Sequence, residues 1–208
     1  MNGTSDIRHQ TSDHTLADAL RQKFPQWVIA THAFRGDQTV VLRREGLLEV
    51  CRFLRDDPAM AFNFIMSVTA VDLLTLGRGE LGETFRPIPA VDPSITWATF
   101  TGDAEGPRDV FGNPSPRFEV VYHLLSLARG HRLRLKVPIE DADAQIDSVT
   151  TIWKGANWFE REAWDMFGIL FTGHPNMKRL LMYEGFQGHP LRKDYPVNRR
   201  QPLVGPVN

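Results

Sequence analysis

The chain has 208 residues, of which 42% are hydrophobic and 24% are charged, and its formal net charge is -1. A chain of this length can bury about 70% of the surface that its unfolded form exposes, so it can build a core without disulfide bonds or a structural metal. The nearly balanced charge excludes a nucleic-acid-binding protein that works through overall electrostatics.

The cysteine count and the hydropathy pattern exclude two further classes. Cys51 is the only cysteine, so the chain has no intrachain disulfide and cannot supply the usual four-cysteine ligation of an iron–sulfur cluster. No apolar run approaches the roughly 20 residues of a membrane-spanning helix, and the N-terminal residues lack the hydrophobic stretch of a secretory signal. We therefore expect a cytoplasmic protein that meets a membrane only through its partners.

The first half of the chain alternates helical and extended patterns. Residues 1–12 are polar and are predicted to be disordered, and Ser12 or Asp13 can cap the helix that follows, which Pro25 ends. The β-branched and apolar patterns then predict strands at 26–31 and 38–43, a helix at 45–56 and a buried strand within 62–76.

Asp72 is an isolated charge inside the buried strand pattern, so it needs a partner. A paired structural carboxylate, a strand end and a functional pocket are all consistent with it. Residues 77–116 contain 6 Gly and 6 Pro, which predicts an insertion with little regular structure that serves as a docking arm or a mobile flap.

Residues 117–127 and 131–138 read as two paired strands, and 146–154 as a short helix. The stretch from Asn157 then places large aromatic residues among charged ones at helical spacing. Arg161 lies one turn before Asp165, and such an intrahelical pair is worth only about 0.2–0.5 kcal/mol. The carboxylates of Glu160, Glu162 and Asp165 are chemically able to act as acids or bases, but no nucleophile accompanies them.

Two Gly-His-Pro triplets follow this helix. The residue before a proline is driven from helical to extended conformations, so His174 before Pro175 and His189 before Pro190 are expected on non-helical backbone. The two imidazoles could bind a metal or relay protons, although two histidines alone make an incomplete metal site. Docking on a neighbouring surface is the other interpretation.

The tail from Met177 onward combines basic residues, prolines and apolar side chains. The prolines prevent a continuous helix, while apolar residues such as Leu191, Tyr195 and Val197 favour burial. Such a segment can lie extended on another protein and become ordered on assembly. It can also wrap over its own domain, and the sequence leaves both interpretations open.

An ordered series of motifs closely resembles the C-type subunit of the proton-pumping NADH-quinone oxidoreductase, respiratory complex I. The series is Glu160-Arg161-Glu162, Asp165-Met166-Phe167-Gly168, Gly173-His174-Pro175, Lys178-Arg179-Leu180 and Gly188 to Pro196. The similarity continues more loosely through 71–72 and 117–126. The insertion at 77–116 departs from the family pattern.

This resemblance implies a non-catalytic peripheral-arm subunit needed to assemble the electron-transfer and quinone-reducing modules. It implies no cofactor in this chain, with the flavin and iron–sulfur clusters on partner subunits, and a peripheral position on the cytoplasmic side of the bacterial cell membrane. The chief partner would be the D-type large subunit of complex I, with the B-type and I-type subunits nearby. The expected partner-interface residues are Glu160, Arg161, Glu162, Asp165, Phe167, His174, Pro175, Arg179, His189, Pro190, Leu191, Arg192, Lys193, Asp194 and Tyr195.

The expected fold class is α+β: a domain at 13–140 with a mixed sheet, followed at 141–208 by a helical region and an extended assembly tail. Two other functions remain open at this point. One is a stand-alone metal-dependent hydrolase that uses His174, His189 and a carboxylate such as Asp165. The other is the equivalent subunit of a related membrane-bound hydrogenase or photosynthetic dehydrogenase.

Overall fold

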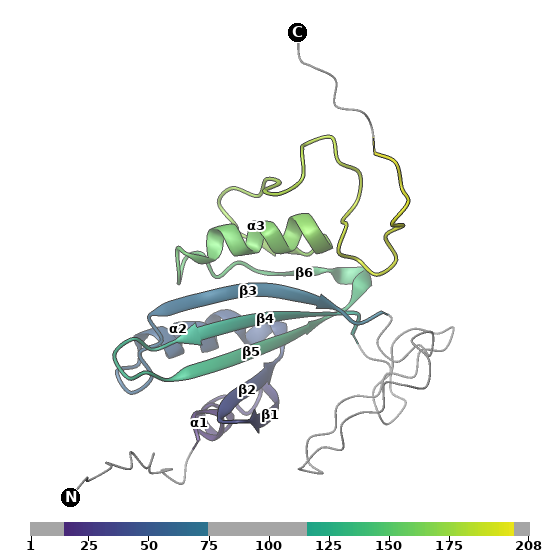
Figure 1. Cartoon of the computed structure of the whole chain (residues 1–208). Coiled ribbons are helices and arrows are strands. Elements are labelled where there is room, and N and C mark those ends of the chain that lie inside the picture. The colour runs from purple at the N-terminus through teal and green to yellow at the C-terminus, as the bar shows by residue number, and fades with distance from the viewer. Residues whose placement is uncertain (1–14, 75–115, 202–208) are drawn as a thin grey trace, which may run out of the picture.

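The computed structural model describes residues 15–74 and 116–201 (Figure 1). The predictions for 1–12 and for the Gly/Pro-rich insertion therefore lie outside the described residues, except at Pro116. The described parts form a five-stranded sheet with helices packed against it, which confirms the α+β class.

The first half begins with α1 (Leu16–Lys23), which Thr15 caps rather than Ser12 or Asp13. The Thr15 hydroxyl accepts the backbone N–H of Asp18, and the Asp18 carboxylate accepts the backbone N–H of Thr15, a reciprocal capping box. The elements that follow are β1 (Val28–Phe34), β2 (Asp37–Leu42), the 3₁₀ turn η1 (Arg44–Gly46) and α2 (Leu47–Asp56).

The sheet is completed by three longer strands, β3 (Phe64–Asp72), β4 (Phe118–Leu125) and β5 (Arg132–Ile139). The strand order is β1-β2-β5-β4-β3, and only β2 and β5 are parallel. This arrangement confirms the mixed sheet, the β4–β5 hairpin and the strand predicted within 62–76. Asp72 lies at the last position of β3, so its carboxylate is at the end of the sheet.

Helix α2 covers one face of the sheet because its apolar residues recur at helical spacing. Leu47, Val50, Cys51 and Leu54 are all fully buried in the core cluster. Cys51 is therefore the small apolar core residue that its surroundings in sequence suggest, and burial raises the pKa of its thiol well above the ordinary value.

The C-terminal half consists of η3 (Asp141–Asp143), β6 (Gln145–Asp147), α3 (Ala156–Phe167) and β7 (Leu170–Thr172). The helix predicted at 146–154 is wrong: Ile146 instead pairs with Phe171 in a parallel β6–β7 ribbon, and the chain then turns into α3. Helix α3 lies along the β3 side of the sheet (Figure 1). The sequence analysis divides the chain at residue 140, and buried side chains from both sides of this position belong to one hydrophobic cluster.

Residues 173–201 contain no helix or strand, as the prolines predict. The tail passes along α3 and then reaches the end of the sheet where β3 stops and β4 starts (Figure 1). Within the two described ranges, no helix combines the length and apolar content that a membrane crossing requires.

Candidate functional site

Helix α3 carries the first part of the predicted site and ends at Gly168. Gly168 has φ of +78°, the left-handed conformation that favours glycine, and its N–H bonds to the carbonyl of Trp164. A Cβ at this position would lie 2.7 Å from Cδ2 of His189. Gly168 therefore ends the helix and also leaves room for the imidazole of the second Gly-His-Pro triplet.

Asp165, near the end of α3, holds the tail onto the helix. Its Oδ2 accepts the backbone N–H groups of Leu180, Leu181 and Met182 at 3.0, 2.9 and 2.9 Å. Its Oδ1 accepts Nη1 of Arg179 at 2.6 Å. Burial raises the pKa of the Asp165 carboxyl, but these donors outweigh it, so the net pKa lies below its ordinary value. Asp165 is therefore an ionised carboxylate with four donors.

The partner of Asp165 is thus Arg179, and the intrahelical pair with Arg161 does not form. Arg161 instead donates to the backbone carbonyls of Lys178 and Arg179, each at 3.1 Å. Arg179 also donates to the carbonyl of Phe186 at 2.8 Å. The two guanidinium groups therefore fold the segment after β7 back on itself and onto α3.

The two histidines of the Gly-His-Pro triplets contact opposite ends of α3. Nε2 of His174 lies 3.2 Å from the carbonyl oxygen of Asn157, and Nδ1 of His189 lies 3.0 Å from that of Asp165. Eight residues of helix, or about 12 Å along its axis, separate these two carbonyls. Among the described residues, no group of three histidine, cysteine or acidic side chains gathers at metal-binding distance. The histidines are thus placed to position the tail, and their separation disfavours the hydrolase hypothesis.

A second site joins the tail to the end of the sheet, around the buried side chain of Arg117. Arg117 binds Asp72 with two nitrogens, Nε to Oδ1 at 3.2 Å and Nη2 to Oδ2 at 3.0 Å. Its Nη1 donates to Asp141 at 2.7 Å. Asp72 is therefore the paired structural carboxylate, and these ion pairs connect β3, β4 and η3.

The tail completes this site, which we call the Arg117 cluster. Nη2 of Arg117 donates to Asp194 at 2.6 Å, and the backbone N–H of Lys193 donates to Asp72 at 2.8 Å. Arg192 forms an ion pair with Asp141. The Arg117 pair, with its hydrogen bond, holds the pKa of Asp194 below its usual range. Two cations thus face three carboxylates where the sheet, η3 and the tail meet.

Glu160 lies in the interior on the sheet-facing side of α3. Its carboxylate accepts the hydroxyl of Ser148 at 2.6 Å and the backbone N–H of Val149 at 2.8 Å. Burial raises the pKa of Glu160 to about 7, and no cation compensates it among the partners just named. Glu160 therefore ties α3 to the chain that follows β6.

Burial corrects part of the predicted partner interface. Glu160 and Asp165 are fully buried and Phe167 is 8% exposed, so these three side chains do not face a partner. They belong to the motif series on which the predicted interface rests, and that series does not show that the chain after β6 contacts Glu160 or that the tail contacts Asp165. The remaining residues of the predicted set are exposed or partly buried: Arg161, Glu162, His174, Pro175, Arg179, His189, Pro190, Leu191, Arg192, Lys193, Asp194 and Tyr195.

Large apolar side chains remain exposed along α3 and the tail. Trp158 is 65% exposed, Leu181 56% and Leu191 51%, and Arg161 stacks over the Trp158 ring. Contiguous exposed apolar patches mark contact surfaces in soluble proteins, so these three side chains are the candidates for such a surface on α3 and the tail. The predicted interface did not include Trp158, Leu181 or Arg117, and for Arg117 the available signal was the need of Asp72 for a partner.

Comparison with known families is consistent with this architecture. Residues 40–201 match the family model described as the 30 Kd subunit of respiratory-chain NADH dehydrogenase. The C-type subunit of NADH-quinone oxidoreductase from Roseiflexus sp. (strain RS-1) is 38% identical over 187 residues, which cover 90% of this chain and 86% of that protein. The corresponding protein of Coxiella burnetii (strain Dugway 5J108-111), which carries the same name, is 40% identical over 188 residues, which cover 88% and 78%.

Two solved structures share the fold. The trypsin-resistant fragment (1-134) of Nqo5 is 28% identical, has a TM-score of 0.51, and the match covers 76% of this chain and 96% of that one. A chain of the membrane-bound sulfane sulfur reductase, an archaeal respiratory membrane complex, is 18% identical with a TM-score of 0.56, covering 87% and 85%. At that identity the second match speaks for the fold alone.

Proposed function

Because this chain belongs to the family of the 30-kDa subunit of respiratory-chain NADH dehydrogenase, we propose that it works as a non-catalytic peripheral-arm subunit of an NADH-quinone oxidoreductase. The observation that carries this proposal is the family match over residues 40–201, together with the identity that extends over 90% of the chain. In this role the chain helps to join the electron-transferring and quinone-reducing modules, whose combined activity couples NADH oxidation to proton translocation.

The chemistry of the electron transfer then belongs to other subunits. The flavin and the iron–sulfur clusters are carried by partners in this proposal, and the buried Cys51, with its raised pKa, is not an available thiolate ligand. Asp165 holds backbone N–H groups of the tail, and Arg117 is paired with the carboxylates of Asp72 and Asp194 within this chain. These features support a structural contribution from this chain.

The partner surface in this proposal is formed by α3 and the tail folded onto it. It presents Trp158, Leu181 and Leu191 as exposed apolar side chains, with Arg161 and Lys193 among them. Aromatic and arginine side chains of this kind dominate binding energy when a partner desolvates them. We propose the D-type large subunit as the chief partner, the B-type and I-type subunits as neighbours, and a position on the cytoplasmic side of the membrane.

A surface double variant tests this assignment. Leu181→Glu with Leu191→Glu places charges on exposed positions of the tail, so the isolated chain should fold as the wild type does. Charge buried against an apolar partner is costly, so the variant should be lost from the large NADH-oxidising assembly on native gels of gently solubilised membranes. Leu127→Glu, at a position 63% exposed on the β4–β5 turn, is the matched control and should stay in the assembly.

Two outcomes separate the parts of the proposal. If the wild-type chain is found in no NADH-oxidising assembly, the function itself is wrong. If the double variant is retained as fully as the control, the function stands and the proposed surface is wrong. These point variants are cleaner than truncation of the chain after Tyr183, because truncation also removes Asp194 from the Arg117 cluster.

A further inference from the structure

The sheet has a second face, opposite to α2, that no helix covers in the described parts of the chain (Figure 1). We call it the open face. Phe34, Phe64, Met66 and Val71 are 48%, 47%, 38% and 41% exposed on its outer strands β1 and β3. Antiparallel sheets commonly leave one face to water, but such faces then carry polar residues at alternate positions. The open face therefore has more apolar area at its margins than a solvent face requires.

A row of polar side chains crosses the middle of the open face. The strand registers align His32 of β1 with Thr39 of β2, Thr39 with Arg134 of β5, and Arg134 with His123 of β4. At about 4.8 Å per strand this row is roughly 14 Å long. Nη1 of Arg134 donates to the Thr39 hydroxyl at 3.3 Å, and the carboxylate of Asp37 is 4.0 Å away. The row itself contains no carboxylate.

Positive charge exceeds negative charge around this row. Lys136 is paired with Glu119 at 2.8 Å, and Arg134 has only the distant Asp37. Arg132 has no carboxylate partner among the residues that the structure describes. Three cations therefore face two carboxylates on the open face.

The positive charges of the open face also affect the pKa values of the two histidines in the row. Partial burial, followed by the charges of Lys136 and Arg134, lowers the pKa of His32 although Glu119 opposes the shift. Partial burial and then Arg134 lower the pKa of His123, against the opposing charge of Asp37. Near pH 7 both imidazoles are thus neutral, and each can donate one hydrogen bond and accept another.

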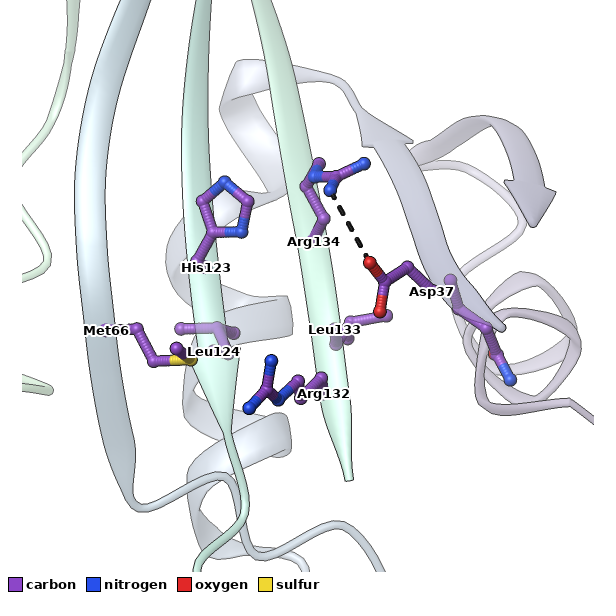
Figure 2. Close-up of a pocket in the computed structure, with 8 residues that line it drawn as sticks. Asp37, Met66, His123, Leu124, Arg132, Leu133 and Arg134 are labelled. Atoms are coloured by element: carbon purple, nitrogen blue, oxygen red, sulfur yellow. Dashed lines mark ion pairs between the residues drawn. The ribbon is translucent and has the colours of Figure 1, made fainter. Parts of the chain in front are cut away.

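A hollow of about 70 Å³ lies beside this row, lined by Met66, His123, Arg132, Arg134 and Asp37 among others. Figure 2 shows the guanidinium groups of Arg132 and Arg134 projecting from β5 on the same side of the sheet as the His123 ring of β4. Because about 10–15 Å³ of such space is enough to hold one water molecule, the hollow is large enough for a carboxyl group. Guanidinium groups bind carboxylates in bidentate fashion, and carboxylates are the anions that protein side chains supply.

We propose that the open face is a second subunit contact, and that its occupant is a segment of a neighbouring subunit which places an Asp or Glu side chain between Arg132 and Arg134. The proposal rests on the proposed function, because it requires the chain to be part of an assembly. The exposed apolar residues at the margins would pack against the same segment, while its carboxylate balances the excess positive charge at the centre.

A zero-length cross-link in the assembled complex tests the chemistry of the occupant. Arg132→Lys keeps the positive charge at an exposed position and supplies an amine that a carbodiimide couples only to a carboxylate in direct contact. The purified assembly carrying this variant should give a product between position 132 and an Asp or Glu of another subunit, identified by mass spectrometry. Arg52→Lys, exposed on the outer side of α2, is the matched control and should give no such product.

Carbethoxylation of the histidines provides the second readout. His32 and His123 should react several-fold more slowly in the assembly than in the isolated chain. An intact assembly with no inter-subunit product at 132 and unprotected histidines overturns the proposal while leaving the proposed function in place. Protection without a product also overturns it, because the face would then be covered by a segment that lacks the carboxylate.

Discussion

The Asp165 carboxylate makes a quantitative prediction about the order of the tail. Replacing it by asparagine keeps the shape of the side chain but removes the charge, and it turns one acceptor into a donor that faces the N–H groups of Leu180, Leu181 and Met182. It also leaves Arg179, whose side chain is 15% exposed, without its anion. Breaking a buried charge pair by removing one partner costs about 3–5 kcal/mol.

That cost should appear as local opening of the segment that Asp165 holds. At 1.4 kcal/mol for each factor of ten, the backbone amides of residues 180–182 in Asp165→Asn should exchange with deuterium at least roughly 100-fold faster than in the wild type. The assay is hydrogen–deuterium exchange of the isolated chain, read on peptides that span 178–183. Amides in β4 and β5 should be unchanged, because the sheet does not depend on this carboxylate.

Glu162→Gln is the matched control, since it neutralises an exposed carboxylate on the same helix. It should leave exchange at 180–182 at the wild-type rate. If Asp165→Asn exchanges as slowly as this control, the four donors around Asp165 do not hold the tail, and our account of the site is refuted.

Two further predictions concern Glu160 and Gly168. Because the folded-state pKa of Glu160 is raised to about 7, its contribution to stability is fully present below its unfolded pKa and is lost as pH rises through about 7, so Glu160→Gln should flatten the fall in urea midpoint between pH 5 and pH 8. The lowered pKa of His174 has the opposite effect on stability in both proteins. The quantity to compare is therefore the difference in urea midpoint between the wild type and Glu160→Gln at each pH, and identical pH profiles would contradict the prediction. Gly168→Ala and Gly173→Ala should each lower the free energy of unfolding by about 1–2 kcal/mol, because both glycines have left-handed backbone. Gly168→Ala should lower it further, since its Cβ meets His189 whereas that of Gly173 meets nothing within 4 Å. Thermal unfolding measures both losses of stability, and equal losses would show that the His189 ring moves away from the new Cβ at no energetic cost.

The sheet was predictable from the sequence because its signals are local. The alternation of Arg132 to Val137 and the turn signal at Gly36-Asp37, where β2 begins, predict strands whose faces differ in polarity. The predicted helix at 146–154 failed because Ile146 is extended only through its pairing with Phe171, a contact that no local pattern contains. Tertiary pairing overrode local propensity there.

The site was predictable in its residues but not in their roles. The motif positions from Glu160 to Asp194 are where the tail and α3 meet, yet Asp165 and Asp194 are satisfied within the chain by Arg179 and Arg117. The sequence alone cannot show whether a charged residue in a proline-rich segment pairs with a residue of the same chain or of another protein. Burial distinguishes the two, and burial requires the fold.

The Arg117 cluster also makes the position of the tail depend on the pairing of β3 with β4. Asp72 and Arg117 meet through the pairing of β3 with β4, and Asp194 follows Arg117 by 77 positions. The three groups come together only where β3 and β4 are paired and the tail has folded back to the end of the sheet. Contact between Asp194 and the Arg117–Asp72 pair therefore indicates that this strand pairing is already in place.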